Sequence, residues 1–183
     1  MIYPINRNIH RPSHLYLDNA LYFISARTKD RCNFFNDNIK KDMLKNKIDN
    51  AVGKYEAKLY SWVILPNHYH LLIAIKFGND LAKIENLING GSSHELNVYD
   101  KQSERKIWYQ YWDYILRDES DFYVRFNYIH NNPIKHGCVK DFNELKDYNY
   151  CSYKDYLEKY GEKWLADCFK KYPITDFSIT EDI

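Results

Sequence analysis

The sequence has few cysteines, and they form no metal-binding or disulfide pattern. None of the four stands in a Cys-x-x-Cys pair or at zinc-finger spacing from a histidine: Cys32, Cys138, Cys151 and Cys168. The chain also lacks a signal peptide and any apolar run of about 18 residues, so we expect no membrane span. We therefore expect packed thiols and a cytoplasmic protein, because structural disulfides are rare in a reducing compartment.

A large net charge is also missing. Charged residues make up 28% of the chain, yet the formal net charge is only +1. A basic excess is typical of proteins that bind nucleic acids, so this balance counts mildly against such a partner but leaves room for a local basic patch. Tyrosine, in contrast, is abundant with 18 residues. Aromatic rings pack in cores and also stack on unpaired bases, so their number alone does not separate the two uses.

Internal repeats and flexible linkers are absent too, and 183 residues suit a single domain. Apolar periodicity predicts four strands, at 21–26, 58–65, 68–76 and 107–115. It predicts helices at 36–54, from Asp80 onward, at 120–131 and at 153–164. This order predicts an α+β fold, a split β-α-β (ferredoxin-like or RRM-like) four-stranded antiparallel sheet with two helices on one face. The other face is left for a further helix or a ligand.

Two helix breaks are expected from local sequence. Gly90-Gly91 should end the helix that begins at Asp80, and Ser92-x-x-Glu95 has the form of a capping box that restarts it. Pro133 should end or kink the helix from Ser120, because proline disfavours the α conformation in the residue before it.

The strand at 68–76 begins with two histidines that can share one ligand. His68 and His70 are two residues apart, so both imidazoles leave the same face of a strand. That spacing suits two ligands of one metal ion. Histidines bonded to backbone or solvent are the plainer alternative, because a short motif alone is weak.

A second candidate group lies in the helix at 120–131 and just beyond it. Tyr128 and Asn132 are four residues apart and are neighbours on one helical face. If that face covers the histidines, Asn132 can be a third ligand, and Tyr128 can present its hydroxyl to a phosphate. A tyrosine with a pKa near 10 is a poor nucleophile, but a divalent ion that bears the developing charge makes the attack feasible. Alternatively, Asn132 caps the turn that starts at Pro133, and His130 points away as a surface or supporting group.

Two further groups are candidate DNA contacts. Arg27 and Lys29 follow a predicted strand and can grip phosphates, although solvated loop charges are the alternative. Ser92 and Ser93 follow the glycine pair at an expected helix start, whose backbone N–H groups can bind a phosphate, with capping as the alternative.

Two separated segments of the chain resemble the REP-associated tyrosine transposases, which are single-tyrosine transposases of the HUH endonuclease superfamily. They are LPNHYHLL at 65–72 and YIHNNPIKHG at 128–137, with weaker likeness at 22–29, 91–97, 112–118 and 150–153. The resemblance covers about residues 20–155. We therefore expect an N-terminal arm at 1–19, an HUH domain at 20–155, and a C-terminal helix and tail at 156–183 that packs on the domain or extends from it.

This resemblance implies the HUH variant of the split β-α-β sheet and an enzyme that cuts single-stranded DNA near an imperfect hairpin. The cut leaves a 5′-phosphotyrosine link and a free 3′-OH, which can reverse the attack and rejoin strands. By the same likeness His68, His70 and Asn132 hold Mg²⁺ or Mn²⁺, and Tyr128 is the nucleophile. Family members often have a histidine at the position of Tyr114.

The expected partner is single-stranded DNA with a hairpin, either REP-like or from a transposon end. We expect a monomer or homodimer that is associated with the nucleoid when it binds DNA. A non-catalytic DNA-binding regulator derived from a transposase is the alternative. A phosphodiesterase that uses water as the nucleophile is a third possibility.

Overall fold

Four strands form one antiparallel sheet in the computed structural model, which describes residues 14–174. The spatial order is β2-β3-β1-β4. The strand bounds are β1 (Ala20–Thr28), β2 (Lys58–Ile64), β3 (His68–Ile75) and β4 (Trp108–Ile115). The predicted α+β class and antiparallel split β-α-β sheet are confirmed. Predictions for 1–13 and 175–183, most of the arm and the end of the tail, lie outside the described residues.

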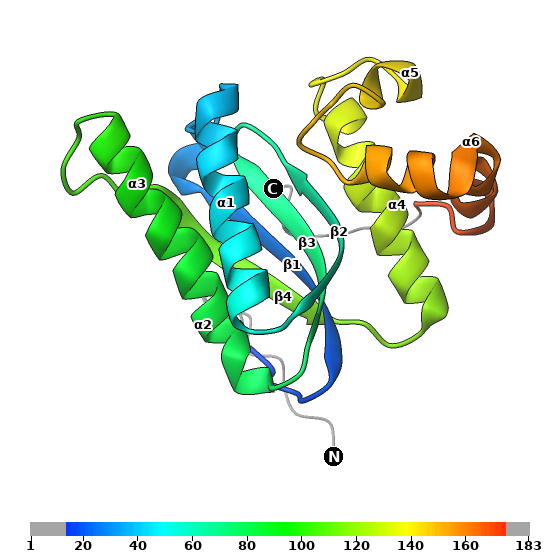
Figure 1. Ribbon diagram of the computed structural model, residues 1–183, viewed down its shortest axis with the longest axis horizontal. Helices are drawn as coiled ribbons and strands as arrows, with labels where there is room; N and C mark the ends of the chain where they lie inside the picture. The colour runs from blue at the N-terminus through cyan, green and yellow to red at the C-terminus, as the bar shows by residue number, and fades with distance from the viewer. Residues whose placement is uncertain (1–13, 175–183) are drawn as a thin grey trace.

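One face of the sheet is covered by α1 (Asn38–Lys54) and by a long helix that runs from α2 (Leu81–Glu85) to α3 (Gly91–Tyr99). Figure 1 shows both helices lying along the strands on this side. Alternate residues of each strand point into this layer, where aliphatic side chains from α1 and β3 are fully buried. Examples are Leu44, Ile48, Leu71 and Ile73. This first core holds the helices to the sheet.

The prediction that Gly90-Gly91 breaks the helix is wrong. The chain passes from α2 to α3 through a π-helical turn (Asn86–Gly90), and Gly90 and Gly91 both have helical backbone angles. Glycine costs a helix about 1 kcal/mol relative to alanine, which packing against α1 can offset. A Cβ on Gly91 would lie 3.3 Å from the Lys47 side chain, so this glycine allows close approach of the two helices.

On the other side of the sheet lie α4 (Glu119–Lys135), α5 (Phe142–Leu145) and α6 (Tyr153–Lys171), grouped together in Figure 1. Pro133 was predicted to end or kink α4, and the first alternative is wrong, because the helix continues to Lys135 and the His136 amide donates to the Asn132 carbonyl at 3.0 Å. A proline in the last turn removes one backbone donor, and the side chains packed beneath the helix compensate for it. They form a second core that includes Phe23, Val63 and Ile129.

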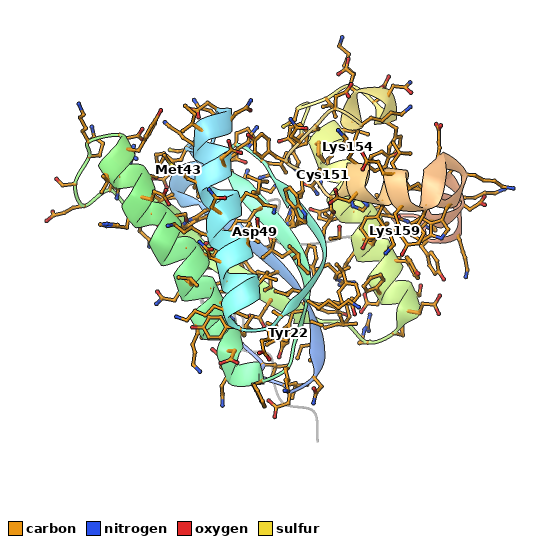
Figure 2. All side chains as sticks on the ribbon, viewed as in Figure 1. Tyr22, Met43, Asp49, Cys151, Lys154 and Lys159 are labelled. Carbon is orange, nitrogen blue, oxygen red and sulfur yellow. The ribbon has the colours of Figure 1, made fainter. Side chains whose placement is uncertain are left out.

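The segment before α6 runs along the exposed edge of β2. Cys151, labelled in Figure 2, forms a β-bridge with Val63, and the Ser152 amide donates to the Trp62 carbonyl at 3.0 Å. The expected boundary between 155 and 156 falls inside α6, which is longer than the predicted helix at 153–164. Leu165 and Cys168 of α6 are buried in the second core, so this helix is packed on the domain.

The described part of the arm, residues 14–19, is tied to the sheet. The Tyr22 hydroxyl, near the lower edge of Figure 2, accepts from the Leu17 amide at 2.7 Å, and the Gly78 amide donates to Asp18 Oδ1 at 2.8 Å. Within residues 14–174, no helix is both long and apolar enough to cross a membrane.

Candidate active site

The face of the sheet that meets α4 carries the two histidines. Alternation along β3 points His68 and His70 to this face, while Tyr69 between them enters the first core. The two imidazole centres lie 5.1 Å apart with their planes at 70°. The prediction that both rings leave the same side of one strand is therefore confirmed.

Helix α4 brings Tyr128 and Asn132 over these rings. The Tyr128 ring centre lies 5.3 Å from that of His70, and Asn132 Oδ1 lies 3.1 Å from His68 Nε2. The Asn132 amide nitrogen also donates to the Tyr128 carbonyl at 3.3 Å, one helical turn earlier. Asn132 thus lies inside α4 and does not cap a following turn, so that alternative is wrong. The structure brings all four predicted side chains together.

Two amide side chains fix the orientation of His68. Asn67 donates through Nδ2 to the Arg31 carbonyl at 3.3 Å, which turns its Oδ1 to His68 Nδ1 at 2.6 Å. A neutral imidazole has one N–H, and this contact places it on Nδ1. In that neutral form Nε2 presents its lone pair to Asn132 Oδ1, whereas a doubly protonated ring donates from Nε2 to Asn132 Oδ1.

Two acceptors at 3.1 Å repel each other unless a proton or a cation lies between them. Adjacent ligands of an octahedral ion with bonds of about 2.1 Å stand about 3.0 Å apart. A second N–H donating to an outer oxygen, here from His68 to Asn67, is typical of metal-ligating histidines. This pair of atoms therefore fits a divalent metal ion.

His70 supports the same conclusion. It is 1% exposed, and neither ring nitrogen has a hydrogen-bond partner of good geometry among residues 14–174. Burial, with smaller effects from His68 and His136, lowers the pKa of His70 well below its usual range, and the nearby Asn132 side chain opposes this only weakly. The ring is neutral at physiological pH and keeps a lone pair. Buried polar atoms without partners are uncommon and call for a ligand.

No group of three His, Cys, Asp or Glu side chains converges as a metal site within the described part of the chain. A metal ion bound by the two histidines would take its third donor from an amide, the Asn132 oxygen, which hard divalent ions accept. A pocket of about 140 Å³ opens beside the histidines. A water needs on the order of 10–15 Å³ of such cavity volume, so this pocket has room for an ion and several waters. Its lining comprises Ser25, Arg27, Arg31, Asn67, His68, His70 and His136.

His136 is a pocket residue that sequence reasoning missed. It follows Asn132 by one turn, and its ring centre lies 4.7 Å from that of His68. The spacing of Tyr128, Asn132 and His136, four residues at each step, was a signal for a shared helical face. The expected helix end at Pro133 concealed it.

The predicted DNA contacts divide into two groups. Arg27 pairs in register with His68 across β1 and β3 and lines the pocket. Lys29 lies in the following turn, half exposed, near the Asp30 carboxylate.

Ser92 and Ser93 belong to the opposite face of the sheet and do not approach the histidines. Ser92 is fully buried and accepts a hydrogen bond from Trp108 Nε1 at 3.0 Å. Its hydroxyl therefore cannot reach a phosphate in this structure. The Ser93 hydroxyl donates to the Asn89 carbonyl at 2.7 Å.

His130 is neither a surface group nor part of the pocket. It is fully buried on the far side of α4, where its Nε2 is hydrogen-bonded to Ser152 Oγ at 2.9 Å and lies 3.2 Å from Ser61 Oγ. Burial lowers the pKa of His130 to about 3, so the ring is neutral. The cluster ties α4 to β2 and to the start of α6. It holds the helix that carries Tyr128.

Tyr114 is the position at which the resemblance implied a histidine in other family members. Its hydroxyl donates to Asp121 Oδ2 at 2.9 Å, and the Arg125 guanidinium lies 3.8 Å from the centre of its ring. These contacts join β4 to the first turns of α4. In this chain Tyr114 therefore helps to fix the first turns of α4 against β4.

Known proteins share this sequence pattern and this fold. The family described as Transposase IS200 like matches residues 17–132. A protein from Haemophilus influenzae described as a REP-associated tyrosine transposase is 26% identical over 158 residues, which cover 79% of this chain and 87% of the relative. The REP-associated tyrosine transposase of Escherichia coli is 26% identical over 145 residues, covering 77% and 79% of the two chains.

A solved structure of a REP-associated tyrosine transposase bound to a REP hairpin has the same fold. It superposes with a TM-score of 0.69 at 20% sequence identity and covers 82% of this chain and 87% of its own. The predicted resemblance to REP-associated tyrosine transposases is confirmed. With more than half of its length matched, the chain belongs to the IS200-like transposase family.

Proposed function

We propose that this chain is a metal-dependent single-stranded DNA endonuclease and strand transferase that acts through Tyr128. The observation that carries the proposal is the convergence of His68 Nε2 and Asn132 Oδ1 at 3.1 Å, with Tyr128 against His70. Relatives are named tyrosine transposases, and one with the same fold is bound to a REP hairpin. Both facts support hairpin-containing DNA as the partner.

His68, His70 and Asn132 would hold Mg²⁺ or Mn²⁺. When bound, such an ion polarises the scissile phosphate and offsets the negative charge that develops on it. Imidazole ligands suit Mn²⁺ better than Mg²⁺. Arg27 at the rim of the pocket is placed to bind a neighbouring phosphate.

The chemistry is a reversible exchange of phosphate esters. The Tyr128 phenolic oxygen bonds to phosphorus while the bond from phosphorus to the 3′ oxygen breaks. The phenol loses a proton and the leaving oxygen gains one, which gives a 5′-phosphotyrosine and a free 3′-OH. Phe23 lies edge-on to the Tyr128 ring, with centres 6.0 Å apart, and His70 packs beside it. These contacts hold the nucleophile in one orientation, which lowers the entropic cost of attack.

One observation favours a second candidate, a non-catalytic DNA-binding module derived from a transposase. Tyr128 is only 2% exposed, so a phosphate must reach a largely covered hydroxyl. A module of this kind would bind the same hairpin without forming a bond to it.

The test is a search for a covalent adduct. Hairpin oligonucleotides from the DNA that flanks the gene are labelled at the 3′ end, incubated with protein and Mn²⁺, and run on a denaturing gel. We expect a labelled band at the mass of protein plus DNA that disappears in Tyr128→Phe and with a chelator. Tyr153→Phe, which changes another buried tyrosine of the second core, should keep the band.

Binding without an adduct would favour the module. Cleavage without an adduct would show that water is the nucleophile, and either result would contradict the proposal.

A further inference from the structure

A β-bulge in β4 changes the direction of one aromatic side chain. Arg27 pairs with Gln110, but the next residue of β1, Thr28, pairs with Trp108, which leaves Tyr109 as the extra residue. In a regular strand Trp108 would share the face of Gln110. Instead Trp108 packs in the first core, and Tyr109 is 41% exposed. Bulges often re-aim a side chain beside an active site.

Arg27 joins Tyr109 to a second ring. Its guanidinium carbon lies 4.9 Å from the centre of the Tyr109 ring and 5.1 Å from that of Trp112. Lys106 Nζ lies 5.8 Å from the same Tyr109 ring. We call Arg27, Tyr109 and Trp112 the aromatic platform. It combines exposed π-surface with positive charge, the pairing that proteins use to hold unpaired bases.

The aromatic platform is continuous with the histidine pocket. A second hollow of about 290 Å³ beside Tyr109 shares two lining residues, Arg27 and Arg31, with the pocket at His68. Its volume is near the lower limit of small-ligand pockets, which suits a single base. The remaining lining residues are Thr28 and Asp30. The Tyr109 ring offers a base a stacking surface, and Arg27 and Arg31 on the lining favour the phosphate attached to it.

The rim between the two hollows is held in an uncommon conformation. Asp30 and Arg31 both have φ of 54°, in the left-handed region that residues other than glycine rarely adopt. Two hydrogen bonds hold the turn, from Asn67 Nδ2 to the Arg31 carbonyl at 3.3 Å and from Thr28 Oγ1 to the Cys32 carbonyl at 2.8 Å. Strained backbone of this kind concentrates at binding and catalytic sites.

We propose that the aromatic platform binds one unpaired base of the DNA strand next to the phosphate held at the histidine pocket. The inference rests on the proposed function. In register, Ser25 lies between His70 on β3 and Trp112 on β4, so the platform stands two strand spacings, about 10 Å, from the histidines. Arg27, between them, is placed for the phosphate that links the two nucleotides. Stacking on an aromatic ring does not discriminate between bases, so this site would orient the DNA strand without selecting its sequence.

The experiment replaces one base at a time with 2-aminopurine, whose fluorescence is quenched by stacking, in the single-stranded extension of the hairpin oligonucleotide. Binding is measured in Mn²⁺ with the Tyr128→Phe protein, so a phosphate can be held at the histidines while tyrosine cleavage plays no part. We expect quenching at one position of the extension. Tyr109→Ala should remove the quenching and weaken binding about tenfold, whereas Tyr109→Phe should retain both.

Tyr99→Ala is the matched control. Tyr99 is 46% exposed on α3, on the opposite face of the sheet, and Lys40 Nζ lies 6.0 Å from its ring centre. This variant should bind and quench like its parent. The inference is overturned if 2-aminopurine is quenched at no position. It is also overturned if the Tyr109→Ala variant, shown to be folded by circular dichroism, gives the same quenching and the same affinity as its parent. Because the assay needs no catalysis, failure of the Tyr128 chemistry does not affect its result.

Discussion

The two faces of the sheet use the same strands for different purposes. On the face under α1, α2 and α3, the side chains are mostly aliphatic. There Glu85 Oε2 accepts hydrogen bonds from Tyr69 at 3.1 Å and Asn89 at 2.9 Å, while Glu85 Oε1 is buried without a partner within residues 14–174. On the face under α4, His70 has no good hydrogen-bond partner within residues 14–174, and His68 Nε2 lies 3.1 Å from Asn132 Oδ1.

The difference separates residues that support the fold from residues that we propose bind a metal ion. Tyr69 and His70 are neighbours on β3, and both are almost completely buried. Burial alone therefore does not indicate function. Tyr69 has internal partners in Glu85 and Asn89, which fits a structural role, whereas both ring nitrogens of the pocket residue His70 lack a hydrogen-bond partner within residues 14–174, which fits ligand binding. Substitutions in the first core should change stability, and those at the histidine pocket should change chemistry.

The largest expected effect is on adduct formation in His70→Leu. Loss of this ligand should reduce the rate by on the order of a thousandfold or more, as for other groups at a reaction centre. Stability should stay the same or rise, because an apolar side chain of similar size replaces a buried ring without partners. Adduct yield, calorimetric Mn²⁺ binding and thermal melting check this. Full Mn²⁺ affinity in the variant would remove His70 from the metal site.

The matching change on the other face is Leu71→Ala. Leu71 is fully buried in the first core, so the truncation should lower the free energy of unfolding by about 2–5 kcal/mol. Urea unfolding measures the loss. At a low temperature, where the variant remains folded, it should still form the adduct. Loss of the adduct under these conditions would show that the two faces are not independent.

The Glu85 carboxylate should make stability depend on pH. Burial raises the pKa of Glu85 from 4.5 to about 8, and the charge of Asp113 adds to this effect. The hydrogen bonds from Tyr69 and Asn89 act in the opposite direction and lower the pKa. The folded state holds the proton more tightly than the unfolded state, so this contribution is complete below pH 4.5 and is lost as the pH rises towards 8.

Glu85→Gln should remove this dependence and stabilise the protein above pH 8 by up to a few kcal/mol. Urea unfolding of both proteins across this range is the check. Parallel pH profiles for the two proteins would contradict the prediction.

The smallest effect is expected for Ser92→Ala. The Trp108 indole loses its acceptor, which should cost about 1–3 kcal/mol of stability because the N–H is buried. DNA binding should not change, since the hydroxyl points into the protein. A fluorescence-based binding titration would show a loss of affinity if the predicted phosphate contact were real.

Local patterns were enough to predict the four strands, α1, the shared face of His68 and His70, and the pairing of Tyr128 with Asn132. These features depend on side-chain periodicity, which any neighbouring layer preserves. The sequence did not predict that α4 covers the histidines, and this arrangement could only be assumed. Periodicity shows which face of a helix is apolar but not which face of the sheet that helix packs on.

The errors occurred where tertiary contacts outweighed local preference. Gly91 lies within α3 because its missing side chain lets that helix approach α1, and Pro133 stays helical above the second core. The bulge at Tyr109 could not be predicted from the sequence of β4 alone, because a bulge depends on how β4 pairs with β1. The internal partners of Ser92 and His130 come from residues far away in the chain.

The most direct test of the account is to identify the residue that carries the DNA. After reaction with hairpin DNA and Mn²⁺ and digestion with nuclease and trypsin, the peptide at 126–135 should gain the mass of a nucleotide. Tyr128 is the only tyrosine in that peptide, which has no serine or threonine. Fragment ions that place the nucleotide on Tyr128, lost in His70→Leu, are the predicted result. A nucleotide on another peptide, or cleavage with all peptides unmodified, would contradict the central claim.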